Sequence, residues 1–399
     1  MGRLRLLTAG ESHGPKMVAI IEGLPAGLKL DFSLLEHEMS RRLSGYGRGF
    51  RARSIERDQV MVNGGVRFGE TIGAPVLLEV VNNDHEKWRG VMEATPIADR
   101  SKAEAKAIRR PRPGHADLVG ALKYGRADLR DALERASARS TVVRVAAGAV
   151  AKTFLKELGI EVCSMVTRIG PAAWPIPSTT DLWAYREAAE SSDVRCPDPE
   201  TADAMRAAID DAQRAKDTVG GSFLVIAQGV PTGLGSYADW DRKLDGRLAQ
   251  AVMSIPAVKA VEIGNGAEAG KLPGSQVHDE IIFDPAHRKN GSGGFARRTN
   301  RAGGLEAGVT NGAELVVHGT MKPIATLGKP LETVSLDDKH PAPATYERSD
   351  VCAVPACAVI AEAAVAFCVA DAVLESYGGD TMNDVVSAHR ERVERYGHS

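Results

Sequence analysis

The sequence predicts a protein that mixes antiparallel β-strands with α-helices in two similar halves, and three observations lead to this. Alternating apolar and polar residues over 58–82 indicate an antiparallel hairpin region. Helical spacing of apolar residues recurs at 34–43 and at 199–217. The stretch 18–28 is echoed at 224–234 with five of eleven positions identical, and a helical segment follows each copy. Eleven residues suggest two β-then-α halves but are too few to establish a duplication.

The composition is that of an ordinary soluble globular chain with a sizeable core. Of the 399 residues, 43% are hydrophobic and 26% are charged, and length alone favours two domains. The net charge is −2, so a basic cluster must be balanced elsewhere, which favours a local anion pocket over a polyanion-binding surface. Aromatic residues make up only 5%, so stacking on nucleic acid is not indicated.

Cysteine usage and hydropathy indicate a cytoplasmic protein. The five cysteines form no CxxC pair and are odd in number, which indicates neither a zinc site nor a disulfide framework. Free thiols are the ordinary state in a reducing cytosol. The N-terminus has no long apolar core with a cleavage site, and no run is expected to approach the roughly 18 apolar residues of a membrane span. We therefore expect no metal, membrane or nucleic-acid partner.

The chain begins with a strand at 2–9, which the sequence GESHG at 10–14 interrupts before a second apolar run at 17–21. A nucleophilic serine is the first chemistry that this Ser-His pair suggests. Adjacent residues of an extended chain point to opposite sides, however, so Ser12 is poorly placed for activation by His13, and no G-x-S-x-G pattern occurs here. A proton-donating or hydrogen-bonding pair is the better interpretation.

A glycine-rich loop with arginines follows the helix expected at 34–43. The loop at 41–49 reads RRLSGYGRG and contains Arg42 and Arg48. Glycines let an arginine approach a ligand closely and leave the loop able to move until a ligand binds. A solvated loop and an anion clamp are equally good interpretations of this pattern taken alone.

The stretch 109–117 is the segment around which the predicted chemistry is organised. It reads RRPRPGHAD, with three arginines and His115 within seven residues. The prolines and the glycine exclude an ordinary helix, and prolines reduce the entropy lost in ordering guanidinium groups, whose forked donors match phosphate or carboxylate. A solvated basic loop or a nucleic-acid patch is the alternative, which the nearly neutral net charge disfavours.

Three further segments carry small, glycine-rich or charged residues. Within 129–149, ERASARST leads into an alanine- and valine-rich run, which suits either a helix end on a phosphorylated ligand or the close packing of two helices. The stretch 264–312 has no strong periodicity and is expected to be disordered or a functional lid. At 348–355, RSDVCAVP opens a long apolar helix that ends at Tyr377 before two glycines.

Together these motifs resemble the chorismate synthase family, and they occur in that family's order. The segments that carry the resemblance are GESHG at 10–14, RPGHAD at 112–117, ERASAR at 134–139, NRAGG at 300–304, KPI at 322–324 and RSDVCAVP at 348–355. The similarity runs from about residue 4 to residue 380, and so many motifs in register are highly specific. Composition and periodicity alone do not lead to this family.

The resemblance implies a single α+β domain over residues 1–399, a sandwich of helices between two antiparallel β-sheets, which replaces the two domains expected from length. It also implies a homotetramer, with mobile loops at about 41–57 and 267–304. The implied reaction is the anti-1,4-elimination of phosphate from 5-enolpyruvylshikimate 3-phosphate to give chorismate, in the shikimate pathway of aromatic amino acid biosynthesis. Reduced flavin mononucleotide (FMN) is required without net redox change. An electron-rich flavin can stabilise electron deficiency at the allylic carbon that phosphate leaves, or transfer an electron transiently.

The resemblance further implies roles for individual residues. It assigns catalysis to His13, His115, Asp350, Ser12 and Ser137. It assigns the substrate's phosphate and two carboxylates to Arg42, Arg48, Arg112, Arg139 and Arg348. It assigns flavin contacts to Arg135, Ala136, Ser137, Ala257, Ala307, Lys322, Pro323, Ile324, Ala325, Thr326 and Arg348. Arg42 and Arg48 also match positions usually assigned to NADPH, a candidate reductant.

Three of these residues would move protons. His13 and His115 resemble one histidine near the flavin and one near the substrate. A side chain that titrates near neutral pH suits giving a proton to reduced flavin or to departing phosphate. Asp350 resembles the carboxylate that helps to take the carbon 6 proton, by way of the flavin in one version of the mechanism.

Two residues depart from the family pattern. Pro256 stands where many relatives have glutamine, which removes a side-chain amide and a backbone donor, and Ala307 stands where many have glycine. Contacts through backbone carbonyls survive both changes. Since no G-x-G-x-x-G follows a strand, the source of electrons, NADPH or an external flavin reductase, stays open. A polyanion-binding module and a serine hydrolase that uses Ser12 and His13 are the alternatives from other functional classes.

Overall fold

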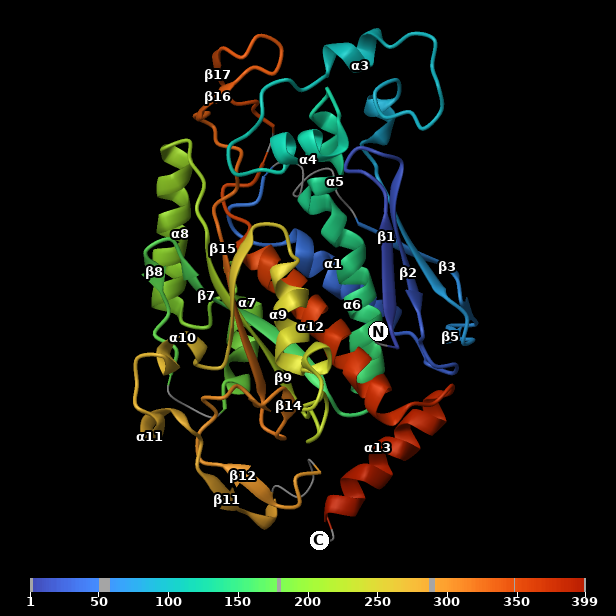
Figure 1. The fold of residues 1–399 in the computed structure, drawn as a ribbon, viewed down its shortest axis with the longest axis vertical. Helices are drawn as coiled ribbons and strands as arrows, with labels where there is room; N and C mark the ends of the chain where they lie inside the picture. The colour runs from blue at the N-terminus through green and yellow to red at the C-terminus, as the bar shows by residue number, and fades with distance from the viewer. Residues whose placement is uncertain (1–2, 50–57, 178–180, 287–290, 348, 398–399) are drawn as a thin grey trace.

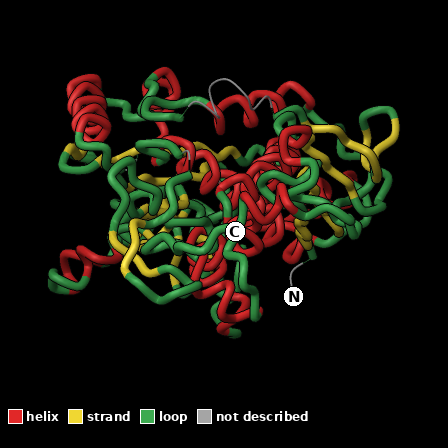
Figure 2. The backbone as a smooth tube through the Cα atoms, turned by 90° about the horizontal axis from the view of Figure 1, so that it is seen from above, coloured by secondary structure: helices red, strands yellow, loops and turns green. Residues whose placement is uncertain are grey.

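Two antiparallel β-sheets lie on either side of a central set of helices (Figure 1). The computed structural model describes residues 3–49, 58–177, 181–286, 291–347 and 349–397. Seen from above, the helices run through the middle, with strands on both sides of them (Figure 2). This arrangement confirms the α+β sandwich that the resemblance implied.

The first sheet comes from the N-terminal part of the chain and has the order β1-β2-β6-β3. Its antiparallel strands are β1 (Arg5–Ala9), β2 (Lys16–Glu22), β6 (Val76–Val81) and β3 (Val60–Gly64). Every second residue of β2 and β6 is buried, as side chains of a strand alternate between its two faces. One face of this sheet therefore packs on the helices.

The second sheet has the order β10-β15-β9-β7-β8. Its antiparallel strands are β10 (Val258–Ile263), β15 (Leu315–Met321), β9 (Gly221–Gln228), β7 (Glu161–Ile169) and β8 (Ala172–Ala173). Residues 223–227 of β9, the middle strand of this sheet, are all buried. Helix α12 (Val354–Tyr377) packs on β7 and β9, and α7 (Arg186–Ser191) and α8 (Pro199–Arg214) pack beside β7 and β8.

The helical layer is centred on two helices that touch each other, α6 (Val142–Lys156) and α12. Helix α6 packs on β2 and β6, whereas α12 packs on β7 and β9. Helices α1 (Phe32–Leu43) and α9 (Leu244–Met253) flank this pair. A Cβ atom added to Gly148 would lie 2.3 Å from the Cβ of Ala363, so the absence of a side chain at Gly148 lets the helices approach closely. Of the two roles considered for the small residues of 129–149, close helix packing is the role of those in α6.

Helix α12 corrects one sequence prediction. Its 24 residues have a mean hydropathy of 2.1 in the most apolar window, so by length and composition this helix could cross a membrane. However, 89% of that window is buried inside the protein. Helix α12 is apolar all round because it is surrounded by α1, α6, α9 and the second sheet.

The echo between 18–28 and 224–234 has a structural counterpart. Thr71 closes the first copy: its Oγ1 donates to the carbonyl of Pro25 at 2.6 Å and accepts from the backbone N of Leu28 at 2.9 Å. Thr310 closes the second copy in the same way, with 2.6 Å to Pro231 and 2.8 Å to the N of Leu234. The backbone of each threonine also exchanges hydrogen bonds with its copy. Matched contacts at corresponding positions support two related halves, one for each sheet.

The remaining elements are short and lie in the connections, except for α13, which has 16 residues and follows α12. They are β4 (Val66–Arg67), β5 (Glu70–Thr71), η1 (His85–Trp88), α3 (Ser101–Ala105), α4 (Asp117–Tyr124), α5 (Arg130–Ala136), η2 (Ala138–Thr141), η3 (Trp183–Tyr185), η4 (Trp240–Arg242), α10 (Gly266–Ala269), α11 (Gly274–Val277), β11 (Ile281–Phe283), β12 (Phe295–Arg297), β13 (Leu305–Glu306), β14 (Val309–Thr310), β16 (Glu332–Val334), β17 (Pro341–Pro343) and α13 (Met382–Gly397). The stretch 264–312 thus forms short helices and hairpins where it is described. Residues 50–57 and 287–290, which belong to the two loops predicted to be mobile, lie outside the described residues.

Candidate active site

A cavity of about 910 Å³ lies where segments of both halves meet. Its wall combines the turn at 12–13, the end of α5 with η2, the first turns of α12 and the segment that follows β15. Most of the predicted site residues line it: Ser12, His13, Arg42, Arg48, Arg112, His115, Ala136, Ser137, Arg139, Ala257, Lys322, Ile324, Ala325, Thr326 and Asp350. Residues predicted from six separate motifs therefore converge on one place.

Four predicted residues are not among those that line the cavity. Arg135 turns away, and its guanidinium donates to the carbonyls of Thr8 and Gly10, each at 3.0 Å. Pro323 stands between two residues that do line the cavity. Ala307 is exposed in the turn between β13 and β14, with a φ of 52°. Arg348 lies outside the described residues. The flavin contacts predicted for these four stay predictions.

His13 is held by a buried carboxylate from α5. Its ring Nδ1 lies 2.8 and 3.0 Å from the two carboxylate oxygens of Glu134, and its backbone N donates to Oε2 at 2.8 Å. The guanidinium of Arg130, one helical turn earlier, donates to Oε1 at 3.1 Å. Burial acts to raise the pKa of Glu134, but His13 and Arg130 outweigh it and hold that pKa below its usual value.

His115 has a matching arrangement. Its Nδ1 lies 2.6 Å from Oδ1 of Asp117, the first residue of α4. The guanidinium of Arg112 donates to the same carboxylate at 2.8 and 3.0 Å. Burial acts to raise the pKa of Asp117, but the hydrogen bonds and charges of His115 and Arg112 hold it well below its ordinary value. Both cavity histidines therefore rest on an ionised carboxylate that an arginine also binds.

Ser12 and Ser137 meet in the same wall. Oγ of Ser137 donates to Oγ of Ser12 at 3.2 Å, and it accepts from the backbone N of Arg139 as the cap of η2. Ser137 has an extended conformation, with ψ of 146°, and so it separates α5 from η2. Residues 12–13 form a turn instead of extended chain, and both line the cavity. The Ser12 hydroxyl contacts Ser137, whereas Nδ1 of His13 faces Glu134.

A single carboxylate holds two of the predicted anion-binding arginines. Arg42 donates to one oxygen of Asp58 at 2.8 Å, and Arg139 donates to the other at 2.5 Å. All three side chains are nearly inaccessible to solvent. Arg42 comes from α1 and Arg139 from η2, so Asp58 links these two elements of the cavity wall. Asp58 thus holds two guanidinium groups side by side in the cavity wall.

Arg48 and Asp350 form an ion pair beside the entrance of α12. The backbone N of Gly49 donates to the other oxygen of Asp350 at 2.6 Å. The buried Nε of Arg48 has no hydrogen-bond partner among the described residues. The glycine-rich loop at 41–49 is therefore tied to Asp350, and this favours the anion-clamp interpretation over a merely solvated loop.

The segment after β15 is linked to the stretch 109–117. Nη1 of Arg112 donates to Oγ1 of Thr326 at 2.8 Å, and Nζ of Lys322 donates to the carbonyl of Gly114 at 2.8 Å. Burial, together with the charge of Lys259, lowers the pKa of Lys322. Gly114 and Lys322 are 208 residues apart in the chain. Two distant motifs thus form one wall of the cavity.

Several lining residues carry no signal that sequence reasoning could use. Trp88 is one: its ring stacks on His13 with centroids 3.7 Å apart, and Nζ of Lys106 lies 4.0 Å from its centroid. Both come from the connection between β6 and α4, which has no distinctive motif. Cys357 also lines the cavity, but burial raises its pKa to about 12, so its thiol is not an activated nucleophile. Glu134 and Asp117 belong to the motifs ERASAR and RPGHAD, but neither residue was assigned a role from the sequence.

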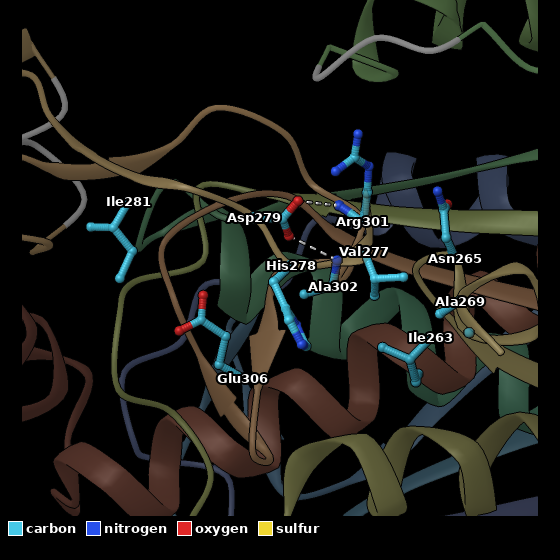
Figure 3. A pocket seen from close by; sticks show the side chains of 11 residues that line it. Ile263, Asn265, Ala269, Val277, His278, Asp279, Ile281, Arg301, Ala302 and Glu306 are labelled. Atoms are coloured by element: carbon cyan, nitrogen blue, oxygen red, sulfur yellow. Dashed lines mark hydrogen bonds between the residues drawn. The ribbon is translucent and has the colours of Figure 1, made fainter. Parts of the chain in front are cut away.

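A second, smaller cavity of about 300 Å³ lies between β10, α11 and the hairpins after it. Figure 3 shows its side chains, with the carboxylate of Asp279 accepting from the backbone N of Arg301 and of Ala302, each at 2.9 Å. None of the described residues predicted for the site lines this cavity. Asp279 holds neighbouring backbone in place and Glu306 pairs with Arg297, so the larger cavity, which most of the predicted residues line, is the candidate active site.

Comparison with known proteins agrees with the geometry. The family model described as chorismate synthase matches residues 4–374. This chain belongs to the chorismate synthase family. The chorismate synthase of Geobacillus kaustophilus is 52% identical over 393 residues, which cover 98% of this chain and 99% of that protein. The chorismate synthase of Bacillus cytotoxicus is 52% identical over 394 residues, 98% of each chain.

A solved structure described as the crystal structure of chorismate synthase is 38% identical and covers 99% of each chain, with a TM-score of 0.79. Membership in the chorismate synthase family makes this chain an enzyme of the lyase class, EC 4.2.3.5. The resemblance drawn from the motifs is thus confirmed. Neither the polyanion-binding module nor the serine hydrolase has support from these comparisons.

Proposed function

We propose that the chain converts 5-enolpyruvylshikimate 3-phosphate to chorismate and phosphate by an anti-1,4-elimination, with reduced FMN and no net redox change. The observation that carries this proposal is the charge of the larger cavity. Its described wall has eight cationic side chains, Arg42, Arg48, Lys87, Lys106, Arg112, Arg130, Arg139 and Lys322, against three carboxylates, Asp84, Glu347 and Asp350. A substrate with one phosphate and two carboxylates requires such an excess in an otherwise nearly neutral chain.

The residues present also fit a flavin nucleotide. Small side chains line the wall at Ala136, Ala257 and Ala325, which leaves room for a flat ring, and apolar surface at Ile255 and Ile360 can cover it. The unsatisfied Nε of Arg48 is a donor that an anionic group could use. Reduced FMN, when bound, supplies an electron-rich ring that stabilises the electron-deficient allylic carbon.

The chain's own residues would bind the substrate and move its protons. Arg42 and Arg139, held side by side by Asp58, present fixed guanidinium groups to an anionic group of the substrate. His13 and His115, each engaged at Nδ1 by a carboxylate, would hold a proton at the other ring nitrogen for the flavin or the departing phosphate. Positioning and general acid catalysis of this kind contribute on the order of 10²–10⁴-fold for each proton donor.

Asp350 would receive the carbon 6 proton, directly or through the flavin. Its two oxygens are engaged by Arg48 and by the backbone N of Gly49. An anionic substrate group that binds Arg48 would leave one carboxylate oxygen of Asp350 available to accept the proton. Ser12 and Ser137, whose hydroxyls share a hydrogen bond, would orient substrate or flavin beside His13.

Further parts of the proposal concern the whole protein. We propose a single-domain subunit, a homotetramer and a cytoplasmic enzyme of aromatic amino acid biosynthesis. The loops near 41–57 and 267–304 would move when ligands bind. The flavin would be reduced either with NADPH, through Arg42 and Arg48, or by an external reductase. Arg135, Pro323, Ala307 and Arg348 stay in the proposed flavin set, with Arg348 also in the substrate set.

The test is an anaerobic assay with photoreduced FMN and 5-enolpyruvylshikimate 3-phosphate, following chorismate absorbance and phosphate release. Asp350→Ala is compared with Glu375→Ala, which removes a carboxylate that pairs with Arg242 and Arg247 away from the cavity. We expect stoichiometric chorismate and phosphate from the wild type and the control, and at least about a 100-fold slower reaction in Asp350→Ala. No product from a wild type that binds FMN would refute the proposed reaction.

A further inference from the structure

We propose that Glu134 and Asp117 are positioning residues, each of which fixes the tautomer and ring orientation of one cavity histidine. This inference rests on the proposed function, in which His13 and His115 carry protons. Neither carboxylate lines the cavity, so neither can touch a ligand there in the described structure. Each would act through the cavity groups that it binds, a histidine and an arginine.

The two arrangements share the same parts although they come from different segments. In both, a carboxylate whose side chain is at most 1% exposed accepts from Nδ1 of a histidine that lines the cavity. In both, a guanidinium binds the same carboxylate: Arg130 for Glu134 at 3.1 Å, and Arg112 for Asp117 at 2.8 Å. Each buried carboxylate already has an arginine that compensates its charge. The additional contact with a histidine is therefore not needed for stability alone.

The ionisation of the carboxylates determines which ring nitrogen carries the proton. An ionised carboxylate is an acceptor only, so the Nδ1 that faces it must donate. Arginine at hydrogen-bond distance keeps each carboxylate ionised despite its burial. A neutral ring with its proton on Nδ1 has an acceptor at Nε2, and the ring that gains a second proton there becomes a donor. Each carboxylate thus prepares Nε2 of its histidine to receive and to give a proton. At His115, Nη2 of Arg112 also lies 3.1 Å from Nδ1 and 3.4 Å from Nε2, so Asp117 must outcompete this donor for Nδ1.

The carboxylates also restrain the position of each histidine. Glu134 binds both the ring and the backbone N of His13, and the ring of Trp88 stacks against the imidazole at 3.7 Å. Asp117 binds the ring of His115 and also the backbone N of Arg112 at 3.1 Å. Loss of either carboxylate would release a ring and a backbone contact together, which is more than the loss of one surface ion pair.

The test compares Glu134→Gln and Asp117→Asn with a matched control, Asp371→Asn. Like Glu134, Asp371 accepts from a backbone N, that of Leu4 at 2.7 Å, and pairs with an arginine, Arg247. Asp371 does not line the cavity, and it binds Leu4 and Arg247, so the control loses a buried carboxylate that contacts no cavity histidine in the described part of the chain. The side-chain volume is nearly unchanged in all three variants.

The first readout is ¹⁵N NMR of the flavin-free protein with labelled histidine, recorded near pH 9 so that imidazoles are neutral. His13→Gln and His115→Gln identify the two resonances. We expect the wild type and Asp371→Asn to have protonated Nδ1 at both histidines, whereas each amide variant loses this preference at its own histidine only. Protonated Nε2 at both histidines in the wild type would overturn the inference without any variant.

The second readout is the anaerobic reaction. In each amide variant we expect kcat to fall about 10- to 100-fold, because a misoriented proton donor affects the reaction step. KM should change less than about twofold in Glu134→Gln, whereas Asp117→Asn should also raise KM, because Asp117 holds Arg112 as well as His115. Amide variants that keep wild-type kcat with altered tautomers would overturn the catalytic role. If the wild type makes no chorismate but the tautomers follow the carboxylates, the proposed function fails and the positioning stands.

Discussion

The contact between Gly148 of α6 and Ala363 of α12 leads to a sharp prediction about stability. A Cβ atom at Gly148 would lie 2.3 Å from the Cβ of Ala363, 2.6 Å from its Cα and 3.0 Å from its carbonyl oxygen. Carbon atoms in contact are about 3.5–4.0 Å apart, so Gly148→Ala must separate the two central helices by about 1.2 Å or more. Two of the three blocking atoms are backbone, which cannot rotate away.

The magnitude follows from two opposing effects. Alanine at an interior helix position is better than glycine by about 0.5–1 kcal/mol, which favours the variant. Overpacking a well-packed core costs about 1–3 kcal/mol or more. We therefore expect Gly148→Ala to lower the free energy of unfolding by about 1–2 kcal/mol. Because α12 carries cavity residues on its first turns, kcat/KM should fall as well.

Gly246 of α9 provides the matched control. A Cβ atom added there has no neighbour within 4 Å, so Gly246→Ala should raise the free energy of unfolding by about 0.5–1 kcal/mol. Urea unfolding at one protein concentration, with the midpoint and slope compared between the two variants and the wild type, measures both changes. A Gly148→Ala variant as stable as Gly246→Ala would refute the close packing of α6 and α12.

Three further predictions concern buried carboxylates. Glu362→Ala removes one of the two carboxylates that Arg41 and Lys152 share, the other being Glu38, and so leaves an excess of buried positive charge; it should cost about 3 kcal/mol in urea unfolding, and a small change would contradict the buried network. Burial raises the pKa of Glu314 from 4.5 to about 7, so the folded state binds its proton more tightly and wild-type stability should fall as the pH rises from about 4.5 through 7. Glu314→Gln should remove this dependence and, after allowance for partial exposure, be about 1 kcal/mol more stable at pH 8 and equal at pH 4, as thermal unfolding can check. The pKa of Asp117 is held below its ordinary 3.8, so its contribution is present above that pH and is lost as the pH falls; Asp117→Asn should therefore flatten the decline of the urea midpoint below about pH 4, and an unchanged slope would contradict the ion pair.

Much of the fold and of the candidate site could be predicted from the sequence. Alternation at 58–82 corresponds to β3 to β6, and the helices expected at 34–43 and 199–217 are α1 and α8. Motifs separated widely in the chain supplied most of the residues that line the cavity. One error arose from judging hydropathy along the chain alone: no run was expected to be as apolar as a membrane span, but α12 is, because it is buried among other helices and the second sheet.

The sequence by itself determined the family, the positions of the main strands and helices and the residue types of the site, because hydrophobic periodicity and short motifs are properties of neighbouring residues. Only the tertiary structure decided which side chains contact one another. Glu134 reaches His13 across 121 residues, and Asp58 joins Arg139 across 81. A periodic pattern says which face of an element is buried but not which element it will face. The packing of two sheets about α6 and α12 makes that choice, and with it determines which carboxylate orients each histidine.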